Sequence, residues 1–340
     1  MTIDPAAPAL LGRTTLAVSR LGFGTGPFGN LLQAASEPAL HQATAAALAA
    51  GLRYFDTAPF YGHGLAEHRA GETLRGVDRG RFVLSTKVGR LLRPNPTARA
   101  EGPFAGILPF DIAPDYSYDA TLRSLDDSMQ RLGLASIDIA LIHDINPRWQ
   151  GAQFEQRYAE AMNGAYRALD RLRGEGVIKA IGVGVNDVDV LLRCTRDADF
   201  DCFMLAGRYT LLDHTALPFL LPECERRRIS ILLAAPYNSG ILATGARPGA
   251  TFWYSEAPPE VMERVGRIEK VCRRHDVPLP AAALQFPFGH PSLASVVAGL
   301  RSAAEVNQAV AWMRHPVPQD LWRELRHEKL IDQAAPLPSS

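Results

Sequence analysis

The feature that most constrains the fold is a repeated alternation of short apolar segments with helical segments along most of the chain. Near-continuous apolar runs of this kind are typical of buried parallel strands. We expect eight strands, at residues 21–25, 53–58, 82–87, 137–143, 178–185, 201–207, 229–236 and 295–299. Helices are expected between and after them, at residues 37–50, 66–74, 118–132, 154–174, 188–195, 214–228, 259–275, 279–288, 301–313 and 319–329.

Eight strands that alternate with helices predict an α/β fold, a single (β/α)8 TIM barrel. Periodicity alone also allows an open doubly wound sheet, but the strand count and the even spacing favour the barrel. Apolar residues make up 47% of the sequence, which is enough for a large core. No linker or change of composition divides the chain. We therefore expect a flexible N-terminus at residues 1–9, a barrel at 10–330 that opens with a hairpin, and a polar tail at 331–340.

Two long segments rich in Pro and Gly follow the third and the seventh strand, at residues 89–117 and 237–260. Long loops on the carboxyl face of such a fold are usually functional. Phe104 and Phe110 lie in the first loop. These two rings either close over a substrate or only pin the loop to the rim of the barrel.

Bulk properties exclude several classes of function. The formal net charge is zero, so no strong electrostatic field indicates a nucleic acid or an anionic membrane as partner. We find no apolar run long enough to span a bilayer, and the start of the chain lacks the pattern of a signal peptide. The four cysteines form no CxxC pair, which favours free thiols in the cytoplasm and no metal site.

Polar side chains follow three of the expected strands. Asp56 and Tyr61 lie at and just beyond the end of the second strand, Lys87 ends the third, and His143 ends the fourth. The carboxyl ends of barrel strands converge on one site. Lys87 can lower the pKa of the Tyr61 phenol, Asp56 can pair with Lys87, and His143 can orient a carbonyl or hydroxyl. Each residue alone is more often structural, but the four together favour proton transfer.

The segments FDTAPFYGHGLAEHRAGETLR, STKVG, LIHD and IKAIGVGVN resemble the aldo-keto reductase superfamily. The similarity runs from about residue 11 to about residue 312. It implies a (β/α)8 barrel that uses a nicotinamide cofactor, with Asp56, Tyr61, Lys87 and His143 as the catalytic tetrad. Tyr61 would be the acid for reduction and, as phenolate, the base for oxidation, with the hydride passing to or from nicotinamide C4.

A narrower resemblance, carried by GRYTLLDH, APYNSGILATG, LPAAALQFPFGHP and HDINPRWQG, is to the aldose 1-dehydrogenase branch. This branch includes dehydrogenases of L-fucose and other D-threo-aldoses, and similar pyridoxal 4-dehydrogenases. It implies oxidation of a sugar lactol to a lactone, or of pyridoxal to pyridoxolactone. Two further alternatives are a general NADPH-dependent aldehyde reductase and, in another class, a non-catalytic subunit that senses the cofactor.

The resemblance also implies residues that hold the nicotinamide half of the cofactor. Gly24 and Thr25 end the first strand, and Asn186 matches the Asn that often contacts the carboxamide. Two positions depart from the common pattern, because Ala206 stands where a Gln is usual and Ala234 where a stacking aromatic is usual.

Other residues are expected at the remaining half of the cofactor. Asn238, Ser239 and Gly240 either meet the pyrophosphate or form an ordinary turn. Arg301 and Ser302 lie at a predicted helix N-terminus, which favours phosphate. No second Arg or Lys lies in this segment, and Glu305 adds negative charge. A 2′-phosphate prefers several positive donors, so we expect NAD, with NADP as the alternative.

The substrate is expected to be a small molecule with an apolar face. Aromatic residues near the predicted mouth are the candidate contacts, namely Phe28, Phe60, Trp149, Tyr237 and Trp253. A sugar ring and pyridoxal both pack on aromatic rings, so these residues do not distinguish the two. A barrel of this size is compatible with a monomer or a homodimer.

Overall fold

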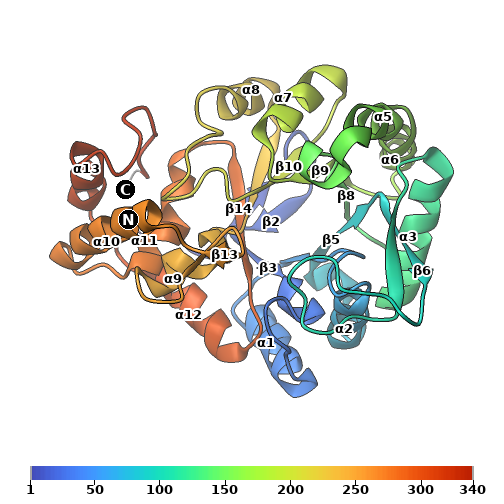
Figure 1. Ribbon diagram of the computed structural model, residues 1–340, viewed down its shortest axis with the longest axis horizontal. Helices are drawn as coiled ribbons and strands as arrows, with labels where there is room; N and C mark the ends of the chain where they lie inside the picture. The colour runs from blue at the N-terminus through green and yellow to red at the C-terminus, as the bar shows by residue number, and fades with distance from the viewer. Residues whose placement is uncertain (1, 339–340) are drawn as a thin grey trace.

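A computed structural model of the chain describes residues 2–338 and contains a closed barrel of eight parallel strands (Figure 1). The strands follow one another around the barrel in chain order, and the last pairs with the first. They are β3 (Leu21–Gly24), β4 (Tyr54–Asp56), β5 (Val83–Val88), β8 (Ile139–His143), β9 (Ala180–Val185), β10 (Cys202–Ala206), β11 (Ser230–Ala234) and β14 (Leu293–Gly299). The predicted (β/α)8 barrel is confirmed, with most strands shorter than expected by one to three residues.

Helices surround the barrel on its outside (Figure 1). The main ones are α1 (Glu37–Ala49), α2 (Leu65–Leu74), α3 (Tyr118–Leu132), α5 (Phe154–Glu160), α6 (Arg167–Gly174), α7 (Val188–Asp197), α8 (Leu220–Arg227), α10 (Pro259–Arg274), α11 (Leu279–Gln285), α12 (Ala303–Arg314) and α13 (Gln319–His327). Within residues 2–338, no helix is long and apolar enough to cross a membrane.

Two helices differ most from the prediction, and both do so for local reasons. The expected helix at 214–228 begins only at Leu220, because the preceding residues form turns in which the Asp213 carboxylate accepts from the backbone and hydroxyl of Thr215. The expected helix at 154–174 is interrupted by a π-helix, Ala161–Tyr166. Gly164 lies there against the backbone of Tyr116, where a Cβ atom would come within 2.6 Å of the carbonyl oxygen.

The amino end of the barrel is closed by a hairpin of β1 (Pro8–Leu10) and β2 (Ala17–Ser19). Leu11, Leu16 and Val18 from the hairpin share an apolar cluster with interior residues of the barrel such as Ile139 and Leu232. The backbone N–H of Gly12 donates to Ser230 Oγ at 2.7 Å and fixes the turn to β11. Side chains therefore fill this end of the barrel, and a ligand site is expected at the carboxyl end.

Both described ends of the chain are fastened to the C-terminal helices. The N–H of Ile3 donates to the Met313 carbonyl at 2.9 Å, although residues 1–9 were expected to be flexible. In the expected polar tail, Ala335 is buried and Gln319 Nε2 donates to the Pro338 carbonyl at 2.5 Å. Met1 and residues 339–340 lie outside the described part.

The two long loops contain structure that their sequences did not predict. The first carries an antiparallel hairpin, β6 (Arg90–Pro94) with β7 (Phe110–Pro114). The second carries the short helix α9 (Ile241–Thr244) and a small hairpin, β12 (Thr251–Phe252) with β13 (Ser255–Glu256). Phe104 is buried at the barrel rim, and Phe110 lies in β7.

Candidate active site

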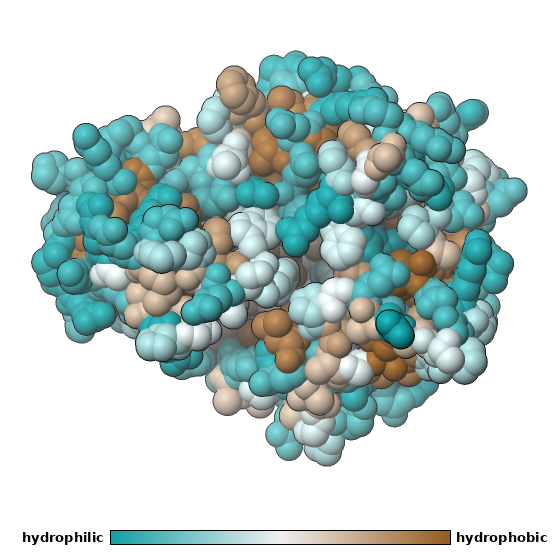
Figure 2. Space-filling view, viewed as in Figure 1, coloured by the Kyte–Doolittle hydropathy of each residue, from teal (hydrophilic) through white to brown (hydrophobic). Residues whose placement is uncertain are grey.

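A cavity of about 320 Å³ opens at the carboxyl end of the barrel. Asp56, Tyr61, Lys87 and His143 all line it, so the structure brings together the four predicted catalytic residues from three neighbouring strands. On the molecular face drawn in Figure 2, hydrophilic residues lie mainly at the periphery, and residues of intermediate hydropathy lie toward the centre. Among residues 2–338, no group of three or more His, Cys, Asp or Glu side chains could hold a metal ion.

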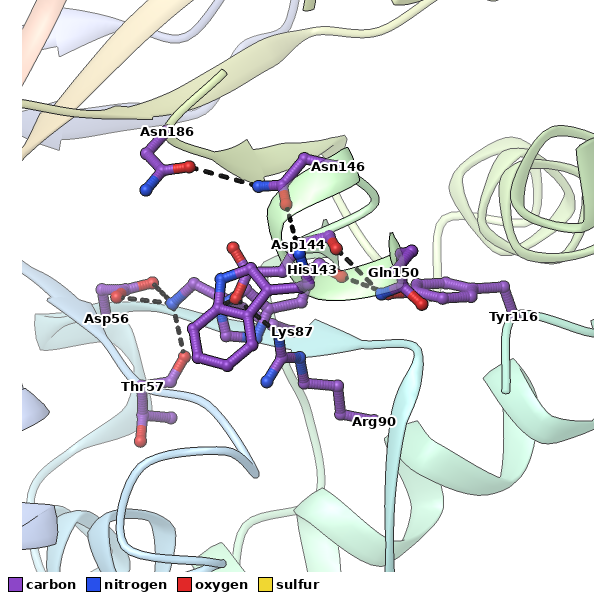
Figure 3. Close-up of polar contacts among 11 residues, drawn as sticks. Asp56, Thr57, Lys87, Arg90, Tyr116, His143, Asp144, Asn146, Gln150 and Asn186 are labelled. Carbon is purple, nitrogen blue, oxygen red and sulfur yellow. Dashed lines mark hydrogen bonds and ion pairs between the residues drawn. The ribbon is translucent and has the colours of Figure 1, made fainter. Parts of the chain in front are cut away.

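A buried ion pair forms the floor of the cavity (Figure 3). Lys87 Nζ donates to both carboxylate oxygens of Asp56, at 2.7 and 2.9 Å, and to the Thr57 carbonyl at 2.9 Å. Ser85 Oγ donates to Asp56 Oδ1 at 2.7 Å and also contacts the Tyr54 hydroxyl. These contacts leave neither side chain free to swing away, so the ammonium has a fixed position.

Tyr61 lies beside this ammonium, with Lys87 Nζ 4.8 Å from the centre of the phenol ring. Burial raises the pKa of Tyr61 to about 12, and the positive charge of Lys87 opposes that rise. From the sequence we expected Lys87 to lower the pKa of the phenol below its ordinary value. In this structure burial is the larger effect, and Lys87 only limits the increase.

The His143 ring also contacts Tyr61, edge to face, with ring centres 6.1 Å apart. Burial, together with the positive charges of Arg90 and Lys87, lowers the pKa of His143 well below its ordinary value. The ring is therefore neutral at pH 7, with one N–H. The strand end that carries it is held by the Tyr116 hydroxyl, which donates to the His143 carbonyl at 2.7 Å.

Three polar residues around His143 were not singled out in the sequence. Asp144 lines the cavity, and Arg90 Nη2 donates to its carboxylate at 2.8 Å (Figure 3). Asn146 Nδ2 donates to Asn186 Oδ1 at 3.2 Å. Asp144 directly follows His143 in the sequence, which is a signal that could have identified it. Arg90 had no such signal, because the hairpin brings it to this place.

The wall expected to face the nicotinamide is built from small residues. Gly24, Asn186, Ala206 and Ala234 all line the cavity. Asn186 is fixed by Asn146 and by Arg208 Nε, which donates to its backbone carbonyl at 2.9 Å. Thr25 does not line the cavity; it is buried, and no described residue hydrogen-bonds to its Oγ1. Glycine and alanine at three of these four positions leave room in the cavity for a planar ring.

The other expected cofactor residues divide into two groups. Asn238 and Ser239 line the cavity, whereas Gly240, Arg301, Ser302 and Glu305 lie outside its lining. Asn238 is held by Thr210 Oγ1, at 2.6 Å, and Ser239 Oγ accepts from the Tyr254 N–H. Ser302 caps α12 by accepting from the Glu305 N–H at 3.2 Å.

Arg301 and Tyr237 each carry a buried polar atom with no hydrogen-bond partner in the described chain. The atoms are Arg301 Nε and the Tyr237 hydroxyl. Burial and the charge of Glu305 raise the pKa of Tyr237 well above its ordinary value. The Tyr237 hydroxyl is thus a buried polar group without a partner outside the cavity lining, whereas Arg301 keeps its ion pair with Glu305, with Nε 3.4 Å from the carboxylate.

Three of the five predicted substrate aromatics line the cavity: Phe60, Trp149 and Trp253. Phe28 does not. It lies in the 3-10 helix Gly26–Gly29, which turns its ring inward so that it packs on Phe23 with centres 5.6 Å apart. Tyr237 also points away from the cavity and packs on Trp312, with centres 6.1 Å apart. The structure therefore places Phe28 and Tyr237 in packing positions.

The sequence and structure are similar to known oxidoreductases. Residues 20–328 match the model of the Aldo/keto reductase family. The chain is 40% identical over 342 residues to pyridoxal 4-dehydrogenase of Microbacterium luteolum, covering 97% of this chain and 100% of the relative. It is also 40% identical to D-threo-aldose 1-dehydrogenase of a Pseudomonas species, covering 96% and 98% of the two chains. An aldo-keto reductase structure from Bacillus halodurans superimposes with a TM-score of 0.74 at 24% identity, over 96% of this chain and 97% of that one.

Proposed function

The chain belongs to the aldo/keto reductase family, and on this premise we propose that it oxidises the anomeric carbon of an aldose in its lactol form to a lactone. It is an NAD(P)-dependent oxidoreductase. One observation carries the proposal. The buried Asp56–Lys87 pair holds a positive charge against Tyr61, next to a neutral His143, on the floor of one cavity.

A bound nicotinamide dinucleotide supplies the hydride acceptor. Tyr61, as phenolate, takes the proton of the anomeric hydroxyl, and Lys87 stabilises the phenolate charge. Asp56 keeps Lys87 charged and in place. The pKa of Lys87 is raised above its ordinary value, because Asp56 and Tyr61 outweigh the unfavourable effect of burial on the ammonium. His143 directs its single N–H toward the reacting oxygen.

Pyridoxal is the second candidate substrate. The relative that bears this name is as similar to the chain as the aldose dehydrogenase, at 40% identity over nearly the whole length of both proteins. Pyridoxal in its hemiacetal form presents the same reacting group, a ring hydroxyl on a carbon that loses a hydride. The tetrad would act on either substrate in the same way.

The proposed cofactor is NAD rather than NADP. The Glu305 carboxylate accepts from the Arg301 N–H at 2.9 Å and lies 3.4 Å from Arg301 Nε. The one positive side chain of this segment is thus already paired, and the carboxylate would repel a 2′-phosphate. A cytoplasmic location belongs to the same proposal. The four cysteines are all free and buried, which suits a reducing compartment.

The test is a comparison of initial rates with NAD and NADP, using L-fucose, other aldoses and pyridoxal as substrates. We expect NADH formation with aldoses, at a rate that Tyr61→Phe abolishes. Activity with pyridoxal alone would select the second candidate. If neither is oxidised and simple aldehydes are reduced with NADPH, the protein is a general reductase. Absence of any turnover, with cofactor still bound, would indicate a non-catalytic sensor.

A further inference from the structure

Asp144 is held in an unusual backbone conformation at the edge of the cavity. It is the first residue after β8 and has a φ of 50°, in the left-handed region that non-glycine residues rarely adopt. Two hydrogen bonds secure it there. Its N–H donates to the Gly184 carbonyl at 3.0 Å, and its own carbonyl accepts from Gln150 Nε2 at 3.0 Å. A strained conformation that neighbouring contacts maintain is a reason to look for a function of the side chain.

The carboxylate of Asp144 is fixed from behind by a buried arginine. Arg90 Nη2 donates to Asp144 Oδ2 at 2.8 Å, and the Arg90 side chain is only 4% exposed. The guanidinium contacts two aromatic rings that also touch each other, 4.2 Å from the centre of Phe60 and 4.6 Å from that of Trp149. Because both rings line the cavity, the hairpin residue Arg90 and the cavity wall form one rigid unit with Asp144.

One oxygen of this carboxylate is left for a ligand. Arg90 uses Oδ2, and no residue in the described part of the chain hydrogen-bonds to Oδ1. The side chain is 13% exposed and lines the cavity. The cations around it are Arg90, Lys87 and Arg148. A neutral hydroxyl is therefore a better donor for Oδ1 than an ammonium group, which these three charges would repel.

We propose that Asp144 is a substrate-binding residue that accepts a hydrogen bond from the hydroxyl on the carbon next to the reacting carbon. The inference rests on the proposed oxidation of an aldose. Asp144 Oδ2 lies 3.5 Å from Nε2 of His143, the residue assigned to the reacting oxygen. Two groups this close can each bind one of two hydroxyls on adjacent carbons. In pyridoxal the ring hydroxyl is one carbon further from the reacting carbon, so the geometry favours the sugar.

The same contact gives Asp144 a second role, which is to set the tautomer of His143. A carboxylate facing Nε2 favours the tautomer with its proton on that atom. Nδ1, which is buried and has no hydrogen-bond partner among residues 2–338, then remains unprotonated. Asp144 thereby ensures that the N–H of His143 points into the cavity. One side chain would position the reacting oxygen through His143 and the adjacent hydroxyl directly.

The test measures kcat/KM for L-fucose and 2-deoxy-L-fucose at saturating NAD. We use wild type, Asp144→Asn and Asp144→Ala. Wild type should prefer L-fucose by about ten- to hundredfold, as expected for a charged hydrogen bond to a substrate hydroxyl. Asp144→Ala should remove most of this preference by lowering activity on L-fucose more than on the deoxy sugar. Asp144→Asn keeps an acceptor for Arg90, so it guards against a folding defect and should give an intermediate ratio.

The outcomes separate this inference from the function on which it rests. Equal activity of wild type on both sugars, or an equal loss on both sugars in the two variants, would overturn the role of Asp144 while leaving the aldose dehydrogenase intact. No oxidation of any aldose by wild type would overturn both proposals. A collapse of the preference in variants that still turn over the deoxy sugar would establish the hydrogen bond.

Discussion

Lys87 Nζ contacts both carboxylate oxygens of Asp56, at 2.7 and 2.9 Å, and both side chains are almost completely buried. A buried ion pair of this kind is expensive to break, because the remaining partner is left charged without compensation. The pair also lies at the cavity floor, against Tyr61. Its contribution to stability and its contribution to activity can therefore be measured separately.

We predict that Lys87→Met lowers the free energy of unfolding by about 3–5 kcal/mol, because Asp56 is left unpaired. The double variant Asp56→Asn/Lys87→Met should recover most of that stability in urea unfolding. Both variants should lose at least about 100-fold in kcat/KM, because Tyr61 then lacks the neighbouring ammonium group.

Lys179→Met is the matched control for this prediction. Lys179 Nζ also contacts a buried carboxylate, Asp138, at 2.8 Å, but its own side chain is 60% exposed and lies outside the cavity lining. Arg79 still pairs with Asp138 after the substitution. Stability should change by less than about 1 kcal/mol and activity should not change. Recovery of activity in the double variant would contradict the assigned role of Lys87.

The pKa of Tyr61, raised to about 12 by burial against the opposing charge of Lys87, predicts how oxidation depends on pH. The base is the phenolate, whose fraction increases as pH rises toward the pKa, so the rate of oxidation should rise with pH between about 6 and 9. Reduction uses the protonated phenol and should not rise over this interval. Removing the charge in Lys87→Met should move the oxidation profile to higher pH. The measurement is a pair of pH–rate profiles, and coincident profiles for the two enzymes would refute the assignment.

Much of the barrel could be predicted because its strands carry their own signal. Segments such as Ile139–His143 are apolar throughout, and each is followed by a helix of clear periodicity. The hairpin of β6 and β7 carried no such signal. Its strands are five residues each, are partly exposed, and are separated by a stretch rich in Pro and Gly, so their pairing depends on tertiary contacts.

Part of the site could likewise be predicted from the sequence, and part could not. Asp56, Lys87 and His143 stand at strand ends, where topology alone brings them together. Arg90 reaches Asp144 only because the hairpin folds over the rim, so Arg90 was not expected at the site. Phe28 was expected at the mouth because it follows the first strand, but the 3-10 turn after Thr25 rotates it into the core. Sequence position predicts proximity to the rim but not the direction of a side chain.

His63 secures the loop that covers the cavity. Its Nδ1 lies 2.6 Å from the Phe110 carbonyl, and its Nε2 accepts from the Glu101 N–H at 3.2 Å. These partners require a neutral ring with its proton on Nδ1. We predict that His63→Ala loosens the loop segment Gly102–Phe104, which lines the cavity, and raises KM by about fivefold, the equivalent of one net hydrogen bond. Limited proteolysis should cut residues 95–109 faster.

His63→Gln is the informative control, because an amide side chain also offers one donor group and one acceptor. It should restore part of the wild-type KM and part of the resistance to proteolysis. If His63→Ala leaves both quantities unchanged, the loop is held by its other contacts, such as the bridge between Leu31 and Phe104.

Glu305 is predicted to set the preference for NAD. Its carboxylate binds both the backbone N–H and the guanidinium of Arg301. Glu305→Gln removes one negative charge but keeps an acceptor for Arg301. The ratio of kcat/KM for NADP to that for NAD should rise about fivefold, which corresponds to about 1 kcal/mol between charges near a surface. Glu37→Gln removes a comparable charge on α1, where Glu37 pairs with Arg69 of α2, and should leave the ratio unchanged. A ratio unaffected by Glu305→Gln would place NAD selection elsewhere.

Gly12 is predicted to be essential for stability and irrelevant to catalysis. It has a φ of 58°, and a Cβ atom there would come within 2.3 Å of the Asp201 carbonyl oxygen. Gly12→Ala should therefore lower the free energy of unfolding by at least about 2 kcal/mol, through strain and displacement of the hairpin. Activity per folded molecule should stay at the wild-type level, because the hairpin closes the end of the barrel opposite the cavity.

Gly174→Ala, in α6, is the control for this prediction. A Cβ atom at this position meets no atom within 4 Å, so the substitution should instead raise the free energy of unfolding by about 0.5 kcal/mol. Urea unfolding measures both effects, and equal stabilities of the two variants would show that the turn tolerates a side chain.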